Sequence, residues 1–149
     1  MYRIVSKEML TPTICRMKVE ASRLASAALP GQFLIVRADE QGERIPLTIS
    51  DFDKEAGTVT IVTQNIGAST SEICSYEEGD SFSDVVGPLG IPSDFTEMAD
   101  EEVAGKRYVF IAGGVGTAPV YPQVKWLHEK GASVDVIIGA KTKELVIYK

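Results

Sequence analysis

The chain has 149 residues, of which 44% are hydrophobic and 24% charged, and its formal net charge is −6. Such a composition is typical of a soluble globular protein, and the negative charge argues against a nucleic-acid partner. No apolar run approaches the roughly 20 residues that cross a bilayer, and the N-terminus lacks the apolar core of a secretory signal. We therefore expect a cytoplasmic protein with no membrane partner.

Residues 1 to about 92 alternate between polar and apolar side chains in short segments separated by turn residues. The predicted strands cover residues 2–9, 13–19, 32–37, 44–51, 58–63 and 81–86. Two helical interruptions are expected at residues 22–27 and 69–76. Six short strands at this spacing predict a small antiparallel barrel.

Cys15 and Cys74 are isolated from each other in the sequence and form no CxxC pair. Two thiols cannot supply the four ligands of an ordinary iron–sulfur cluster. The sequence favours two buried small hydrophobic side chains, and no metal site is predicted.

One candidate site is the predicted strand that begins at Arg44. Side chains alternate between the two faces of a strand. Ile45, Leu47 and Ile49 would then point into the barrel, and Arg44, Pro46, Thr48 and Ser50 outward. A guanidinium matches the oxygens of a diphosphate, Pro46 offers a flat apolar surface, and Thr48 offers a hydroxyl. An ordinary edge strand, with Pro46 at an unpaired edge, is the alternative.

A second candidate is the segment Gly67, Ala68, Ser69 and Thr70, which precedes a predicted helix. Hydroxyl residues at this position are commonly helix N-caps. A glycine followed by hydroxyls at a helix N-terminus is also a favourable diphosphate site. Both interpretations stay open on these residues alone.

The pattern of polar and apolar residues changes after Pro92. Residues 93–105 are acidic and predict a linker with a helical turn. A strand at residues 108–112, a glycine turn, a helix at 120–130 and a strand at 133–138 follow, which predicts a parallel βαβ unit. The glycine turn contains Gly113, Gly114, Val115, Gly116 and Thr117, whose amides can hold phosphate oxygens. The fold class is therefore mainly β with an α/β part, divided into residues 1–98 and 99–149.

Five motifs in this order resemble the ferredoxin reductase-type flavoproteins. They are Pro30-Gly-Gln-Phe33, Arg44-Ile-Pro-Leu-Thr-Ile49, Gly67-Ala-Ser-Thr70, Gly87-Pro-Leu-Gly90 and Gly113-Gly-Val-Gly-Thr-Ala-Pro119. Within this family the likeness is to small electron-transfer subunits. One is the alpha subunit of NADH-dependent ferredoxin–NADP reductase, which is sulfide dehydrogenase-like. The sequence Ile-Pro-Leu-Thr at residues 45–48 favours this subunit. The alternative is the electron-transfer subunit of dihydroorotate dehydrogenase.

The resemblance implies an FAD-binding barrel followed by an incomplete NAD(P)-binding domain. It assigns Arg44 to the FAD diphosphate, and Pro46, Leu47 and Thr48 to the isoalloxazine ring and ribityl chain. It assigns Ile61, Val62 and Thr63 to the ribose and adenine, and Gly67, Ala68, Ser69 and Thr70 to the diphosphate. Gly113, Gly114, Val115, Gly116 and Thr117 would face the nicotinamide nucleotide. The motif Gly87-Pro-Leu-Gly90 would be a turn near the cofactor, or a plain tight turn.

The implied function is an oxidoreductase that passes electrons between NAD(P)H and an iron–sulfur or ferredoxin-type acceptor through FAD. No acid–base catalytic residue is predicted, because the flavin carries the chemistry. The resemblance implies further elements after residue 149, including a [2Fe-2S] centre, so we expect a truncated chain that is inactive alone. A larger oxidoreductase subunit is the expected partner, and the unfinished sheet favours self-association. A flavin-free docking module that uses the acidic stretch 94–102 is the alternative from another class.

Overall fold

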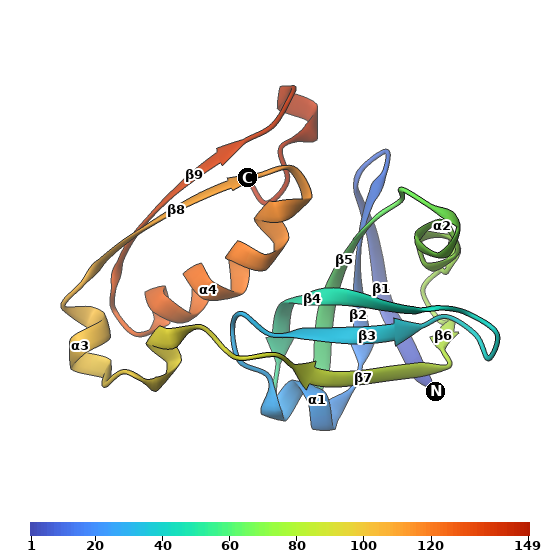
Figure 1. Cartoon of the computed structure of the whole chain (residues 1–149), viewed down its shortest axis with the longest axis horizontal. Coiled ribbons are helices and arrows are strands. Elements are labelled where there is room, and N and C mark those ends of the chain that lie inside the picture. Colours follow the sequence, from blue (N-terminus) through green and yellow to red (C-terminus); the bar gives the residue numbers. More distant parts are fainter.

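The chain folds into a β-barrel part and a smaller α/β part, which lie side by side (Figure 1). The structure is a computed structural model that describes all 149 residues. No helix is both long and apolar enough to cross a membrane.

Seven antiparallel strands form the barrel part, in the order β6-β1-β2-β5-β4-β3-β7. Their bounds are β1 Tyr2–Thr11, β2 Ile14–Glu20, β3 Phe33–Arg37, β4 Arg44–Asp53, β5 Thr58–Gln64, β6 Ser81–Phe82 and β7 Asp84–Leu89. The barrel prediction is confirmed, but the sixth predicted strand is divided at Ser83. The Ser83 amide donates to the carbonyls of Arg37 and Ala38 at 3.1 and 3.0 Å. The chain thereby pairs β6 with β1 and β7 with β3, so that consecutive strands cover both edges of the sheet.

The motif Gly87-Pro-Leu-Gly90 is not the predicted turn, because β7 continues to Leu89. A side chain at Gly87 would meet the Leu34 Cβ at 3.0 Å and the Leu24 Cδ1 at 3.2 Å. Glycine is therefore required at position 87 for β7 to lie close to β3 and to helix α1, which spans Ser22–Ala27.

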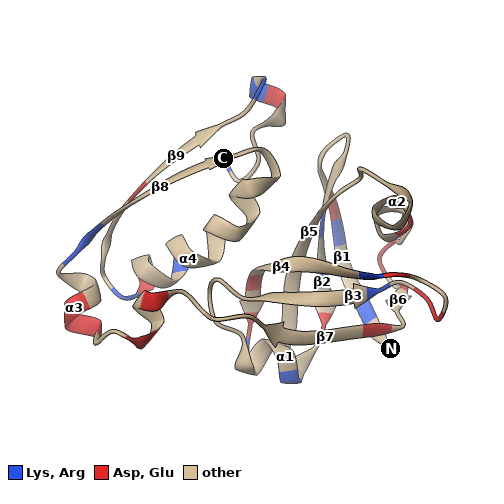
Figure 2. Cartoon of the chain, viewed as in Figure 1, with Lys and Arg blue, Asp and Glu red and all other residues tan.

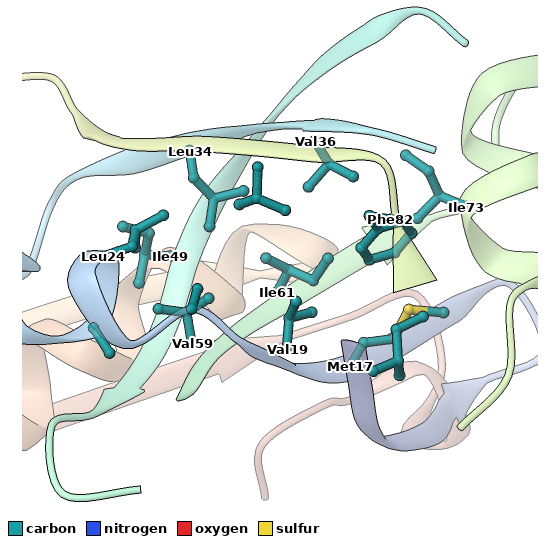
Figure 3. Close-up of a cluster of buried hydrophobic side chains, with 14 of the residues drawn as sticks. Met17, Val19, Leu24, Leu34, Val36, Ile49, Val59, Ile61, Ile73 and Phe82 are labelled. Atoms are coloured by element: carbon teal, nitrogen blue, oxygen red, sulfur yellow. The ribbon is translucent and has the colours of Figure 1, made fainter. Parts of the chain in front are cut away.

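Inward side chains of the barrel form one core of 17 buried residues, most of them β-branched or leucine. Figure 3 shows Leu34, Ile49 and Ile61 pointing into this interior from three different strands. Phe82 lies near Ile73 at one end of the core, where helix α2 (Ala68–Ser75) covers the barrel. The alternation predicted for β4 is confirmed, since Ile49 is in the core while Ile45 and Leu47 pack against it.

The α/β part contains helix α3 (Asp100–Ala104), strand β8 (Arg107–Gly113), helix α4 (Thr117–Glu129) and strand β9 (Ser133–Gly139). The strands β8 and β9 are parallel, as predicted. Phe95 and Met98 pack against a small cluster formed by Val103, Leu127 and Ala132. Side chains on the N-terminal side of residue 98 thus already belong to the packing of the α/β part.

Helix α4 covers one face of the β8–β9 sheet and leaves the other bare (Figure 1). On the bare face, Val109, Ile111 and Ile137 are 59%, 78% and 58% exposed. An exposed apolar face of this kind is a common feature of a surface that another element or another chain covers.

Helix α4 also packs on β4 of the barrel, and the contact depends on a proline within the helix. Pro122 has no N–H, so the carbonyl of Ala118 four residues earlier has no helical donor. The Ser50 hydroxyl donates to that carbonyl at 3.0 Å. Lys125 of the same helix pairs with Asp51 at 2.8 Å. The two parts are therefore joined by polar contacts on adjacent residues of β4.

The C-terminal residues complete this junction, which the sequence did not indicate. Ile147 is buried with Ile14, Val62 and Ala118. The Tyr148 hydroxyl lies 2.6 Å from the Ser50 hydroxyl. Burial raises the pKa of Tyr148, because the charged phenolate is poorly solvated there.

Cys15 is fully buried, and its sulfur lies 3.2 Å from the sulfur of Cys74. Burial, reinforced by Cys74, raises the pKa of the Cys15 thiol from 9.0 to about 12. The folded state therefore holds this proton more tightly than the unfolded state, and the corresponding stability is lost as the pH rises above 9.

We expect the free energy of unfolding to fall between pH 9.0 and about 12 as the unfolded chain loses the Cys15 proton first. Cys15 would contribute up to roughly 1.4 kcal/mol per pH unit to this fall. Urea unfolding at several pH values measures this slope. In Cys15→Ala the slope should be shallower, although the variant is less stable at every pH. An identical slope in both proteins would show that the Cys15 thiol does not contribute.

Candidate functional site

Strand β4 changes its partner halfway along, and this change opens a gap in the sheet. Residues 44–48 pair with β3, whereas the pairing with β5 begins at Ile49 opposite Ile61. Residues 44–48 of β4 and 62–64 of β5 are consequently not paired with each other. Backbone groups along this gap are free to meet a bound molecule.

Arg44 begins β4 on the outer face of the barrel, as predicted. Its Nη1 lies 2.9 Å from Asp84 Oδ2, and the Arg44 side chain is 52% exposed. Exposed ion pairs contribute little to stability. The Arg44 guanidinium is therefore able to exchange the Asp84 carboxylate for a phosphate at small cost.

The N-terminus of α2 lies beside the same end of β4. The hydroxyl of Ser69 donates to the carboxylate of Glu43, the residue before Arg44. Figure 2 shows this end of β4 as a mixture of basic residues and an acidic β3–β4 loop. The start of α2 therefore contacts the residue before Arg44, whereas the Arg44 guanidinium itself pairs with Asp84 of β7.

The hydroxyl of Thr70 is engaged within the loop that precedes α2. Thr70 Oγ1 accepts hydrogen bonds from the amides of Ile66 and Gly67 at 3.0 Å each, and it donates to the Gly67 carbonyl. The amides of Ala68, Ser69 and Thr70 form the first helical turn, where backbone donors have no acceptor within the helix. Thr70 thus shapes the turn before α2 and leaves the first amides of the helix as the groups available to an anion.

Residues 61–63 of β5 carry buried side chains. Ile61 belongs to the barrel core, Val62 packs at the junction with α4, and Thr63 is 1% exposed. Contact between these residues and a bound nucleotide would have to use their backbone. The ribose and adenine roles implied for them stay predictions.

The glycine turn joins β8 to α4 as predicted, but α4 begins at Thr117 rather than at Val120. Gly114 has a φ of +54° and nothing within 4 Å of its missing side chain, so the turn is open to a ligand. Helix α4 starts early because Pro119 is tolerated in a first turn, where amides lack helical partners anyway. The Thr117 hydroxyl is buried and has no hydrogen-bond partner.

The outer face of β4 runs between the turn before α2 and the glycine turn before α4. The Glu43–Ser69 contact lies at one end, and the Ser50–Ala118 hydrogen bond lies near the other. Glu43 and Ser50 are seven residues apart in the chain, or about 23 Å at 3.3 Å per residue. Pro46 and Thr48 lie between them, with Pro46 exposed and Thr48 half-buried. An elongated anionic ligand with a flat ring fits this arrangement.

Neighbouring strands add apolar residues to this face that the sequence did not single out. Ile35 of β3 is paired with Pro46 and with Val86 of β7, and Phe33 is paired with Thr48. Val86 is 40% exposed. The alternation of β3 placed Phe33 and Ile35 on the outer face, but their register with β4 could not be read from the sequence.

A cavity of about 280 Å³ lies elsewhere, between the β4–β5 turn and α4. Its lining is rich in charged side chains and includes Asp51, Lys54, Lys125 and Glu129. Residues 51–53 of β4 line this cavity, whereas residues 44–50 do not. No group of three or more His, Cys, Asp or Glu residues is placed to hold a metal ion.

No family model matches the sequence. Among curated proteins, the chain is 56% identical over its whole length to an uncharacterised protein in the adh 3′ region of Clostridium beijerinckii, and it covers 50% of that protein. It is 36% identical over 144 residues to a homologue of the dihydroorotate dehydrogenase B (NAD(+)) electron transfer subunit from Thermotoga maritima, and it covers 49% of it. The chain thus spans about half the length of these relatives.

Solved structures agree with this relationship. A structure of an NADH-dependent reduced ferredoxin-NADP oxidoreductase superposes on the whole chain with a TM-score of 0.88 and 35% identity, over 51% of its own chain. Phthalate dioxygenase reductase superposes with a TM-score of 0.77 at 21% identity, which is similarity of fold alone. The β-barrel and the first βαβ segment recur together in both structures.

Proposed function

Since the chain contains a ferredoxin reductase-type FAD-binding domain, we propose that it binds FAD on the outer face of β4 and serves as the flavin module of an electron-transfer protein. The observation that carries this proposal is the contact between Glu43 and Ser69, which places the N-terminus of α2 against the residue that precedes Arg44. A cation and a row of unpaired amides at one point are complementary to a pyrophosphate.

Different residues of this face would hold different parts of FAD. Arg44 and the amides of residues 68–70 would bind the pyrophosphate, while Pro46 and Thr48 would contact the isoalloxazine ring and the ribityl chain. Residues 62–64 pair with β2 but not with β4, and their backbone on the β4 side would face the ribose and adenine. When bound, the flavin supplies two-electron chemistry toward nicotinamide and one-electron chemistry toward metal centres. The protein's task is then to fix the position of the ring.

Gly113, Gly114, Val115, Gly116 and Thr117 would form part of an NAD(P)H site beside that ring. The open turn at Gly114 and the unpartnered Thr117 hydroxyl support this assignment. The Ser50–Ala118 hydrogen bond would set the distance between the two nucleotides. A [2Fe-2S] centre would have to be bound outside this chain, since its two cysteines are too few to hold one.

Two subfamilies are candidates for the complete activity. Named curated relatives support an electron-transfer subunit of the dihydroorotate dehydrogenase type. The match to the NADH-dependent reduced ferredoxin-NADP oxidoreductase supports a ferredoxin-linked reductase instead. In either case a larger oxidoreductase subunit would be the partner, and the bare apolar face of β8–β9 is available for self-association or for covering by further elements.

A titration of the purified chain with FAD tests the proposal. Binding is expected to quench flavin fluorescence and to shift the visible absorption bands. If the flavin spectrum stays unchanged at saturating protein, the flavin-free docking module becomes the better interpretation. Mass measurement with candidate subunits would then identify what the chain docks to.

Replacing Glu43 with glutamine should tighten FAD binding by about two- to fivefold, the range for removing an unfavourable charge at a helix N-terminus. The Glu43 carboxylate competes with pyrophosphate for the Ser69 hydroxyl and repels it. Isothermal titration with FAD measures the change. Glu40→Gln in the same loop is the matched control and should leave the dissociation constant unchanged. Weaker binding in Glu43→Gln would mean that the carboxylate holds the turn in its binding geometry.

A further inference from the structure

A pair of thiols lies beneath the helix that carries the proposed pyrophosphate site, and the electron-transfer function makes no use of it. Cys15 projects from β2, and Cys74 lies in the last turn of α2. Their sulfurs are 3.2 Å apart, although 58 residues separate them in the chain. Both cysteines are free in the structure.

The two thiols differ in their access to solvent. Cys15 is fully buried in the barrel core, whereas Cys74 is partly exposed. The Cys15 S–H donates to the sulfur of Cys74, and the Cys74 S–H donates to the Thr63 carbonyl at 3.7 Å. A small oxidant would therefore reach Cys74 first, with Cys15 already in contact behind it.

A cation lies next to this pair. The Lys7 ammonium is 2.8 Å from the Cys74 carbonyl and pairs with Glu77, while its side chain is only 10% exposed. Burial and Cys74 raise the pKa of the Cys15 thiol, and the Lys7 ammonium offsets only part of this rise. The surroundings thus combine a partly exposed thiol, a nearby cation and a second thiol within reach, which is the arrangement of a redox-responsive cysteine.

We propose that Cys15 and Cys74 form a peroxide-oxidisable dithiol, and that the resulting disulfide ties α2 to the barrel. In the first step, the Cys74 thiolate attacks one oxygen of hydrogen peroxide, the O–O bond breaks, and hydroxide leaves and takes up a proton. In the second step, the Cys15 sulfur attacks the Cys74 sulfenic acid, the S–O bond breaks, and water leaves with the Cys15 proton. Two thiols and one peroxide give one disulfide and two waters.

The disulfide would require little movement. A disulfide bond is about 2.05 Å long, so the two sulfurs must approach by roughly 1.2 Å. Ile73 is the one fully buried side chain of α2, and apart from those of the Cys74 thiol the polar contacts of the helix with the barrel part are those of Lys7 with its last turn and of Ser69 with Glu43. A shift of this size in one short helix is compatible with the rest of the barrel. The bond would close a loop of about 60 residues and so restrict the unfolded chain.

Alkylation of thiols after denaturation tests the proposal in the intact chain. Reduced protein should take up two alkyl groups, and peroxide-treated protein none, with a loss of two hydrogens in the intact mass. Dithiothreitol should restore both sites. Peptide mapping should show one Cys15–Cys74 crosslink within a single chain, and the midpoint of thermal unfolding should rise by about 5–15 °C.

Single substitutions assign the two roles. In Cys15→Ser, peroxide should leave Cys74 as a sulfenic acid that a carbon nucleophile traps. In Cys74→Ser, Cys15 should remain a thiol, because it is buried. Two alkylatable thiols in peroxide-treated wild type, oxidation of Cys74 without a crosslink, or crosslinks between chains only would each overturn the proposal. The wild-type map decides even if a variant fails to fold.

The consequence for the cofactor rests on the proposed FAD site. A crosslinked α2 is ordered in advance, so FAD should be released more slowly from oxidised than from reduced protein. Release at an equal or faster rate would overturn this consequence, while the crosslink itself would stand. If neither form binds FAD, the proposed function fails, and the thiol measurements remain valid independently.

Discussion

Replacing Arg44 with alanine should weaken FAD binding by roughly 1.5–3 kcal/mol, or about 10- to 150-fold in the dissociation constant, without unfolding the barrel. This is the range for a hydrogen bond to a charged group. The Arg44 side chain is half exposed and its one ion pair, with Asp84, is on the surface. Its loss should therefore leave the free energy of unfolding within about 0.5 kcal/mol of wild type.

Arg107→Ala is the matched control for this measurement. Arg107 is also an exposed arginine at the start of a strand, and it pairs with Asp135 at 2.6 Å. It lies on β8, away from the outer face of β4, so its removal should leave FAD binding unchanged. Equal dissociation constants for Arg44→Ala and wild type would remove Arg44 from the site. Equal losses in both variants would indicate a general effect of net charge instead.

Phe82→Ala should have the largest effect on stability, a loss of about 3–5 kcal/mol. Phe82 is fully buried and stacks on Tyr76 with a centroid distance of 5.3 Å. It also lies in the two-residue strand β6, which covers the β1 edge of the sheet. The substitution therefore creates a cavity where the barrel closes and where α2 packs. Chemical denaturation with circular dichroism measures the loss.

Ile66→Ala is the appropriate comparison, because Ile66 is 79% exposed just before α2. Surface substitutions of this kind change the free energy of unfolding by about 0.5 kcal/mol or less. A loss below about 1 kcal/mol in Phe82→Ala would mean that the barrel end is loosely packed and that α2 is not supported by it. Lost FAD binding in Phe82→Ala at temperatures where the barrel remains folded would show that the α2 turn depends on this packing.

The β8–β9 sheet is covered on one face only, and the chain spans about half the length of its relatives. Val109, Ile111 and Ile137 are exposed on the side that α4 does not cover. Parallel sheets of this kind are usually covered on both faces. The proposed FAD face of β4, by contrast, is built from residues 43–70 together with neighbouring barrel strands. FAD binding can therefore be tested on this chain even where the complete electron-transfer activity cannot.

The sequence by itself determined the barrel strands, the helices and the side chains of β4 that point into the barrel. Alternation identified the barrel strands and the inward and outward sides of β4, because the side-chain period of two is a local property of an extended chain. Glycine and hydroxyl residues likewise marked the start of α2 to within one residue, since they act on the nearest turn of backbone. The start of α4 was predicted three residues too late, at Val120 instead of Thr117. The division of the last barrel strand at Ser83 was missed, because it depends on carbonyls of Arg37 and Ala38, far away in the sequence.

Only the tertiary structure decided which of these local features meet. Strand register placed Ile35 opposite Pro46 and left β4 and β5 unpaired beyond Ile49 and Ile61. The Glu43–Ser69 contact, the Ser50–Ala118 hydrogen bond and the Cys15–Cys74 contact each join residues that lie 26, 68 and 59 positions apart. Contacts of this kind follow from closing the barrel and docking α4 on it, and no local pattern of side chains encodes them.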